Sequence, residues 1–171
     1  MDKNLNTVRK IRLIAETFRF TDDERKCLFR VIRQIAKVED CLSSQITHRM
    51  YDELSTAMEQ ITAITDKFNF SADEENTLFR LIRKQANKRV VSPGEVVHLM
   101  YENIAKTKTC KENVLSGAIL DVYDCTDVSC FSSLGAFYDC HKKGILTKAA
   151  KRWLNKMTKR KMKESPTLVP T

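Results

Sequence analysis

The sequence predicts an all-α protein, a single-domain bundle of about seven helices that contains a tandem helical repeat of fifty residues. Three observations support this prediction. The 171 residues include only 4 Gly and 3 Pro, and helix-favouring residues fill the long stretches between them. Apolar residues recur at steps of three and four positions, which is the spacing of an amphipathic helix. The chain also aligns with itself, without a gap, when residues 11–51 are placed over residues 61–101.

The internal alignment indicates one supersecondary unit followed by its copy. A repeat of this length usually stacks on its copy so that the two bury a shared face. We expect repeat units of about 8–57 and 58–107 within one domain that covers residues 1–164. The most similar segments are 18–24 with 68–74, 28–33 with 78–83, and 48–51 with 98–101.

The first helices follow from apolar spacing and capping signals. The pattern over residues 5–18 predicts an amphipathic helix. Thr21 and Glu24 form a capping box, in which the hydroxyl accepts a hydrogen bond from the amide three residues on and the Glu side chain reaches back. A second helix is therefore expected over about 22–38.

The third helix and the second copy continue this plan. A helix starts near residues 43–44, and its apolar spacing extends to Phe68, which would join the two copies. Ser71 and Glu74 repeat the capping box and start the next helix. Pro93, at a first helical position, predicts the start of the helix that follows.

Past Thr107 the repeat ends, and an apolar, Cys-rich stretch follows over residues 110–140. Its apolar pattern predicts one helix over about 111–124 and another over about 128–139. Two lysines and a glycine at 142–144 predict a turn.

The last predicted helix, over 145–163, is amphipathic and strongly basic, and residues 165–171 are expected to form a flexible tail. Its apolar face is formed by Leu146, Ala149, Ala150, Trp153 and Met157. Residues 142–164 include ten Lys or Arg and one acid, a net charge of +9. The whole chain has a formal net charge of +8, so the remainder carries about −1. The basicity therefore belongs to one segment.

This basic helix is the main candidate binding site. It could bind an anionic membrane surface, calmodulin or nucleic-acid phosphate, or it could be a docked terminal helix with solvated lysines. Among the binding roles a phosphoinositide-like surface leads, because the aromatic residues lie on the apolar stripe and are not interleaved with lysines for base stacking. The candidates for anion binding are Lys148, Lys151, Arg152, Lys156, Lys159 and Arg160, with Trp153 as the membrane-facing candidate.

Two earlier helices carry basic stripes that could collect phosphate groups. Arginines on adjacent helical turns suit a phosphorylated headgroup. The alternative is a solvated helix face with intrahelical ion pairs. The candidates are Arg30, Arg33, Arg80, Arg83 and Lys84.

No motif points to an enzyme, a cofactor or a metal. The chain contains no P-loop, dinucleotide fingerprint, nucleophile elbow or zinc-protease motif. His48 and His98 occupy the same repeat position but lack the neighbours of a catalytic triad. One further group fits no usual zinc-ligand spacing: Cys125, Cys130, Cys140 and His141.

The N-terminus does not resemble a secretory signal, and no apolar run approaches membrane-spanning length. The 6 Cys are not arranged as a compact disulfide framework. We therefore expect a cytoplasmic protein with reduced thiols that can associate peripherally with membranes.

The C-terminal hundred residues carry a further pattern: Phe70-x3-Glu74 opens a basic helix, Val122-Tyr123-Asp124 and Asp127 end a later one, and Leu134 and Phe137-Tyr138 follow. This pattern resembles the TIPE family, the tumour-necrosis-factor-induced protein-eight-like regulators. The resemblance implies an all-helical fold around an apolar tunnel for a lipid acyl chain, phosphoinositide binding at the tunnel mouth, and a role in cell-death and immune signalling. Carried over by position, it places Arg80, Arg83 and Lys84 near that mouth.

Together these observations predict a non-enzymatic helical regulator that binds an apolar or lipid ligand with an anionic headgroup, or a membrane surface. Two alternatives stay open. One is a protein-interaction adaptor that offers a groove to a partner helix. The other, weaker, is a nucleic-acid-associated module that uses the basic C-terminal helix.

Overall fold

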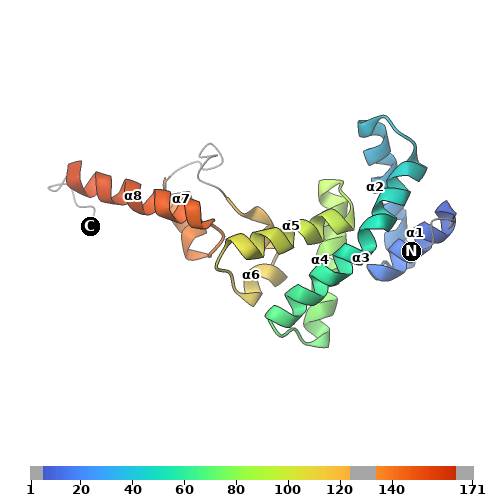
Figure 1. Ribbon diagram of the computed structural model, residues 1–171, viewed down its shortest axis with the longest axis horizontal. Helices are drawn as coiled ribbons and strands as arrows, with labels where there is room; N and C mark the ends of the chain where they lie inside the picture. The colour runs from blue at the N-terminus through green and yellow to red at the C-terminus, as the bar shows by residue number, and fades with distance from the viewer. Residues whose placement is uncertain (1–5, 124–133, 165–171) are drawn as a thin grey trace. The chain divides into compact units, whose positions relative to one another are not determined.

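The computed structural model describes residues 6–123 and 134–164 (Figure 1). These residues form eight α-helices, one 3₁₀ helix and no β-strand, so the predicted all-α class is confirmed. The chain divides into two compact units, Met1–Tyr101 and Glu102–Thr171. The elements are α1 Thr7–Thr17, α2 Asp22–Glu39, α3 Ser43–Lys67, α4 Ala72–Arg89, α5 Pro93–Lys106, α6 Lys111–Leu115, η1 Ala118–Asp121, α7 Leu134–Lys142 and α8 Lys148–Glu164.

Helices α2 and α4 begin with the predicted capping boxes. The amide of Glu24 donates to the Thr21 hydroxyl at 3.3 Å, and the Glu24 carboxylate accepts from the Thr21 amide at 3.1 Å. Ser71 and Glu74 form the same two bonds at 3.2 and 3.0 Å. Each box satisfies amide groups that the first helical turn leaves without an internal partner.

The turns of the first unit use left-handed residues at positions fifty residues apart. Arg19 and Asn69 have φ values of 59° and 51°, and Asp40 and Val90 have values of 53° and 55°. This conformation costs an ordinary L-residue about 1–2 kcal/mol and suits Asn and Asp best. Val90 is the least favourable of the four, because its side chain is β-branched.

Backbone structure thus agrees closely between the two sequence copies. Helices α2 and α4 start fifty residues apart and end fifty residues apart, and each has 18 residues. The third helix, α3, runs unbroken to Lys67 and ends with Phe68 as its C-cap, as its apolar spacing predicts. The tandem repeat as a complete stacked structural unit stays a prediction.

The core of the first unit takes apolar side chains from all of its helices. Helix α3 packs against both α1 and α2. The apolar stripes that define each helix in the sequence are the buried faces. The most deeply buried large residues are Ile14, Phe18, Leu28, Ile46, Leu78, Phe79, Ile82 and Met100.

The second unit departs from the sequence prediction first at α6. A single helix over 111–124 is wrong, because α6 ends at Leu115 and the chain turns at Gly117, which has φ 85°. Glycine reaches this conformation without a steric penalty, and it separates α6 from η1. The helix predicted over 128–139 lies partly outside the described residues, and its described part is α7.

The last helix starts three residues later than predicted, at Lys148. The segment before it is held extended by an isolated parallel bridge between Tyr123 and Leu146. The Tyr123 amide donates to the Ile145 carbonyl, and the Thr147 amide donates to the Tyr123 carbonyl, both at 3.2 Å. These bonds occupy the backbone that a longer helix would need.

The predicted turn before this segment is confirmed. Gly144 has φ 73°, and a Cβ atom there would lie 2.6 Å from the Lys108 carbonyl oxygen. A glycine is therefore required both by the backbone conformation and by the close approach of a second backbone segment.

The apolar face of α8 packs inside the second unit. Phe137, Leu146, Ala150 and Leu154 form a buried cluster. Ala149 was predicted to lie on the apolar face and is exposed instead, because the buried stripe follows Leu146, Ala150 and Leu154 at four-residue steps. No helix in the described ranges combines the length and apolarity needed to cross a membrane.

Candidate anion-binding site at the start of the last helix

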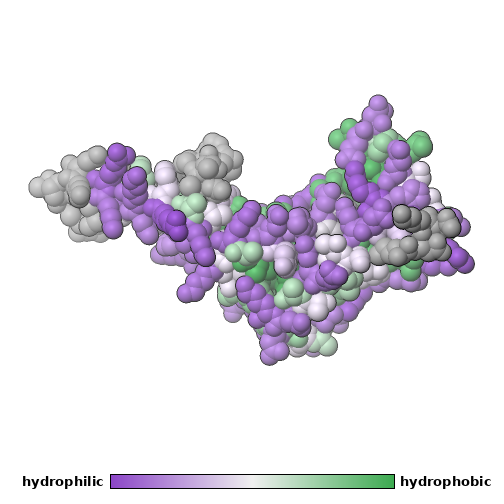
Figure 2. Space-filling model, viewed as in Figure 1, coloured by the Kyte–Doolittle hydropathy of each residue, from purple (hydrophilic) through white to green (hydrophobic). Residues whose placement is uncertain are grey.

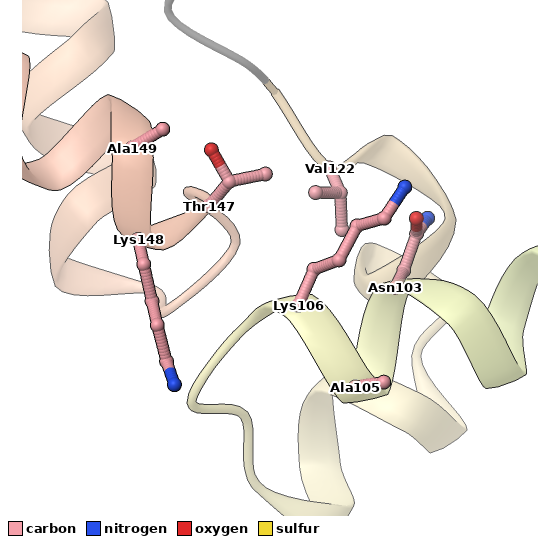
Figure 3. Close-up of a pocket in the computed structure, with 7 residues that line it drawn as sticks. All are labelled: Asn103, Ala105, Lys106, Val122, Thr147, Lys148 and Ala149. Atoms are coloured by element: carbon pink, nitrogen blue, oxygen red, sulfur yellow. The ribbon is translucent and has the colours of Figure 1, made fainter.

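A cavity of about 400 Å³ lies in the second unit, where the end of α5 faces the start of α8 (Figure 3). In Figure 3 the Lys106 side chain extends from α5 toward Val122, and Lys148 extends from the first turn of α8. The lining residues are Asn103, Ala105, Lys106, Val122, Thr147, Lys148 and Ala149.

Thr147 starts α8 at the edge of this cavity. Its hydroxyl accepts a hydrogen bond from the Ala150 amide at 3.2 Å, as an N-cap residue does. Its carbonyl accepts from the Lys151 amide at 3.0 Å. The first amides of a helix have no internal acceptor, and the helix dipole makes this end positive. The cavity is thus bordered by a helix end that favours negative charge.

Asn103 fixes the other wall. It is a buried polar residue, and its Nδ2 donates to the Ile119 carbonyl at 2.9 Å. The Thr107 hydroxyl donates to the Asn103 carbonyl at 2.8 Å. The first bond ties the last turn of α5 to η1, and that turn carries Lys106.

Two lysines and a positive helix end therefore line one cavity, with the Lys106 and Lys148 side chains extending in different directions (Figure 3). Lys106 and Lys148 are both exposed, so their ammonium groups are solvated and available to an anion. Lys148 is one of the candidates from the sequence. Lys106 is not, because it lies 36 residues before the basic segment and only the fold brings it near. A phosphate or carboxylate group suits this donor set.

The other basic residues of α8 are distributed around its solvent side. Arg152, Lys156, Lys159 and Arg160 are exposed, and Lys151 is half-buried. Figure 2 shows that the side of α8 turned toward the viewer is mostly hydrophilic. The helix therefore presents a basic surface while its apolar stripe is packed.

Trp153 does not project freely from this surface. Its ring packs against Phe137, with the ring centroids 5.3 Å apart, and the residue is half-buried. Its aromatic surface is thus engaged within the second unit. Membrane contact by Trp153 stays a prediction, and the packing does not supply an argument for it.

The earlier basic stripes differ in how their residues are engaged. Arg83 donates to the Glu24 carboxylate at 2.9 Å and to the Phe18 carbonyl at 3.1 Å, so its guanidinium is held by internal acceptors. Arg30 donates to the Asn87 side chain. The remaining candidates Arg33, Arg80 and Lys84 are exposed. The structure does not collect these five residues at one cavity.

The Arg83 ion pair also changes the acidity of Glu24. Burial by itself would raise the pKa of Glu24, but hydrogen bonds from Arg83 and Thr21, together with the charge of Arg83, outweigh it and lower the pKa. This shift marks the pair as a structural contact between α2 and α4.

A second cavity, of about 390 Å³, lies in the first unit between α3 and α5. Its wall includes three acids, Asp52, Glu53 and Glu95, against one arginine, Arg49, so it is less suited to an anion than the first cavity. Burial, opposed by the hydrogen bond from Ser92 and assisted by the charge of Glu95, raises the pKa of Glu53. The Ser92 hydroxyl donates to that carboxylate at 2.8 Å.

The two histidines are built into helix contacts. The Nδ1 atom of His48 lies 3.0 Å from the Lys10 ammonium, and the Nδ1 atom of His98 lies 3.0 Å from the Gln60 side-chain nitrogen. Lys10 and Gln60 are also fifty residues apart. An ammonium group can only donate, so Nδ1 of His48 is the acceptor. This arrangement matches a structural role for both rings.

The cysteine and histidine group from the sequence cannot be assembled, because Cys125 and Cys130 lie outside the described residues. Cys140 and His141 are on α7, and the Nδ1 atom of His141 is buried without a hydrogen-bond partner among the described residues. Burial raises the pKa of the Cys140 thiol. Within the described ranges, no three His, Cys, Asp or Glu side chains are placed to hold a metal ion.

Comparison of the chain with protein-family models, with curated proteins and with solved structures finds no match. The resemblance to the TIPE family gains no support from these comparisons.

Proposed function

We propose that this is a non-enzymatic helical protein that binds an anionic, phosphoinositide-like headgroup at a membrane surface. The observation that carries the proposal is that Lys106, Lys148 and the α8 N-terminus line one 400 Å³ cavity. The exposed bases that continue along α8 extend the same positive surface. A peripheral position at an anionic cytoplasmic membrane follows from this proposal.

The expected contact is electrostatic. A basic residue near an anionic bilayer contributes about 1 kcal/mol, and the contribution falls off within a Debye length. The four exposed bases of α8 after its first turn therefore supply several kcal/mol at low salt. The headgroup would occupy the cavity, and these residues would lie along the lipid surface.

Apolar ligand binding has less support. The described apolar side chains between residues 110 and 140, such as Val114, Ile119 and Phe137, are buried in the core of the second unit. The proposal therefore rests on the headgroup and the surface. A role in cell-death or immune signalling rests on the family resemblance alone.

Sedimentation with liposomes tests the proposal on the full chain. Neutral phosphatidylcholine vesicles are compared with vesicles that also contain phosphatidylinositol bisphosphate. We expect binding to the anionic vesicles only. The triple variant Arg152→Gln, Lys156→Gln, Lys159→Gln should lose at least about tenfold in affinity, because three surface charges are removed.

The matched control removes the same charges elsewhere, at Arg12, Lys88 and Lys108, which are also exposed. It should bind like the unmodified chain. The double variant Lys106→Gln, Lys148→Gln should reduce the preference for the bisphosphate headgroup over phosphatidylserine. Equal losses in both triple variants would refute a specific α8 surface. Binding to duplex DNA with no binding to vesicles would favour the nucleic-acid alternative.

A further inference from the structure

One face of α4 is covered by the corner between α1 and α2, and we call it the α4 contact face. It consists of Glu75, Asn76, Phe79, Arg83 and Asn87, and each of the five contacts that corner. The contacts are made by the backbone of Phe18 and the side chains of Arg19, Glu24 and Arg30.

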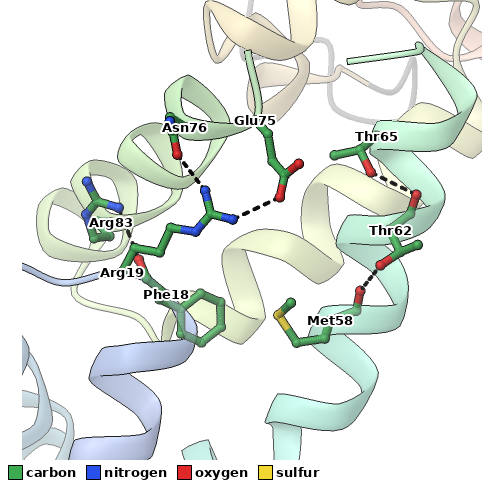
Figure 4. A network of polar contacts seen from close by, with 8 residues as sticks. All are labelled: Phe18, Arg19, Met58, Thr62, Thr65, Glu75, Asn76 and Arg83. Atoms are coloured by element: carbon green, nitrogen blue, oxygen red, sulfur yellow. Dashed lines mark hydrogen bonds and ion pairs between the residues drawn. The ribbon is translucent and has the colours of Figure 1, made fainter. Parts of the chain in front are cut away.

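Arg19 covers the first part of this face (Figure 4). Its guanidinium forms an ion pair with Glu75 at 2.9 Å and donates to the Asn76 side chain. The same group lies 4.1 Å from the centre of the Phe79 ring, a cation–π contact. Phe79 is 1% exposed, so this cover is complete.

The Glu24 carboxylate and the Phe18 carbonyl cover Arg83 in the second part of the face. The Arg83 side chain is only 12% exposed. The α4 contact face therefore shows which groups bind residues in this arrangement. A helix corner supplies a carboxylate and a backbone carbonyl to the arginine, and it supplies a flat guanidinium group to the phenylalanine.

The equivalent face of α2 has no such cover. Fifty residues earlier the five positions are Arg25, Lys26, Phe29, Arg33 and Lys37, which we call the α2 outer face. Steps of one, three and four residues place them on one side of the helix.

The residues of the two faces differ strongly in solvent exposure. Phe29 is 41% exposed where Phe79 is 1% exposed. Lys26, Arg33 and Lys37 are all exposed. The Nε atom of Arg25 is buried without a hydrogen-bond partner among the described residues, and it lies 3.9 Å from the Asp22 carboxylate, an ion pair within the same helix. The α2 outer face thus repeats the positions of a covered face without the cover.

The charge of the α2 outer face determines which kind of protein surface could bind to it. The α4 contact face has one acid and one base, whereas the α2 outer face has four bases around one phenylalanine. Two copies of the α2 outer face would bring eight cations together, which opposes a symmetric dimer. The complementary surface has to be acidic.

We propose that the α2 outer face binds an acidic helix corner of a partner protein. A carboxylate of that corner pairs with Arg33, as Glu24 pairs with Arg83. In the covered face, Arg19 lies opposite Glu75 and Asn76. In the proposed complex, an acid of the partner takes the place of Arg19 and lies opposite Arg25 and Lys26. The chain of the corner covers Phe29. This surface is separate from the α8 site and does not depend on the proposed headgroup binding.

The covered face provides the design of a probe. The probe is a stapled peptide of residues 16–30, the corner that covers α4, with Arg19→Glu and Arg30→Glu. These two changes place acids opposite Arg25 and Lys37. The control is the unmodified stapled peptide, which presents arginines to the same positions.

The measurement is a titration of the full chain, followed by amide NMR spectra. We expect shifts confined to residues 25–37 and binding at least about tenfold tighter for the acidic peptide than for its control. The double variant Phe29→Ser, Arg33→Glu should abolish binding, while Lys84→Glu, an exposed change of the same charge on α4, should not. Because the altered side chains are at least partly exposed, circular dichroism should confirm that both variants fold.

Four results would overturn the proposal. The first is no shift at millimolar acidic peptide, and the second is a set of shifts located outside α2. The third is loss of liposome binding in the Phe29→Ser, Arg33→Glu variant, which would make the face a lipid contact. The fourth is concentration-dependent self-association that Phe29→Ser removes, which would make a second copy of the chain the occupant.

Discussion

Phe29 and Phe79 allow the covered and uncovered faces to be compared by one substitution. They are the same residue type at equivalent positions of two 18-residue helices. Replacement by alanine should be strongly destabilising at Phe79 and mildly destabilising at Phe29. The difference measures the free energy that the α1–α2 corner contributes by covering α4.

The magnitude follows from burial. Complete burial of a phenylalanine side chain is worth about 1.5–3 kcal/mol, and the cavity left in a packed site raises the cost of Phe→Ala to about 3–5 kcal/mol. Phe79 is 1% exposed, so the full cost applies. Phe29 is 41% exposed, so about three-fifths of the burial term, or roughly 1–2 kcal/mol, is lost, and solvent fills the space. We expect a difference of about 2–3 kcal/mol.

Urea unfolding followed by far-ultraviolet circular dichroism gives the two free energies. The denaturant slopes of both variants should match that of the unmodified chain, so that midpoints can be compared directly. Equal losses at the two positions would refute the reasoning. That result would mean that Phe29 is covered in solution, and the α2 outer face would no longer be open.

Three further predictions concern a carboxylate and two backbone conformations. Glu24→Gln should destabilise the protein at pH 7 by under about 1 kcal/mol, a value discounted for solvent exposure. The lowered pKa of Glu24 means that its contribution is present above the unfolded pKa and lost as pH falls through the folded pKa, so the difference should vanish in acid unfolding curves. Val90→Asn should stabilise by up to about 1 kcal/mol in thermal unfolding, because asparagine tolerates the left-handed conformation; a loss would show that the valine side chain outweighs the strain. Gly144→Ala should cost about 2–3 kcal/mol, because it adds strain at positive φ and a clash with the Lys108 carbonyl; an unchanged melting temperature would contradict the turn.

The sequence predicts the first unit well because its signals are local. Capping boxes at Thr21 and Ser71 act within one helical turn, and the apolar spacing of α3 runs without interruption. In the second unit the decisive groups are distant from one another in sequence. The bridge between Tyr123 and Leu146 shifts the start of α8 to Lys148, and no local sequence pattern predicts this bridge.

The candidate site could be predicted only in part for the same reason. The bases of α8 are visible as a charged run in the sequence. Lys106 becomes part of the site only when Asn103 binds the Ile119 carbonyl and sets the last turn of α5. The engagement of Arg83 by Glu24 likewise depends on two residues that are 59 positions apart in sequence.

The contact between Lys10 and His48 has a consequence for chemical labelling. Lys10 is 6% exposed, with its ammonium 3.0 Å from the His48 ring and 4.9 Å from the centre of the Tyr51 ring. An acylating reagent reaches this amine only when α1 separates from α3. Lys10 should therefore be acylated far more slowly than the exposed lysines of α8. Its modification rate, read by mass spectrometry, gives the frequency with which the first helix opens.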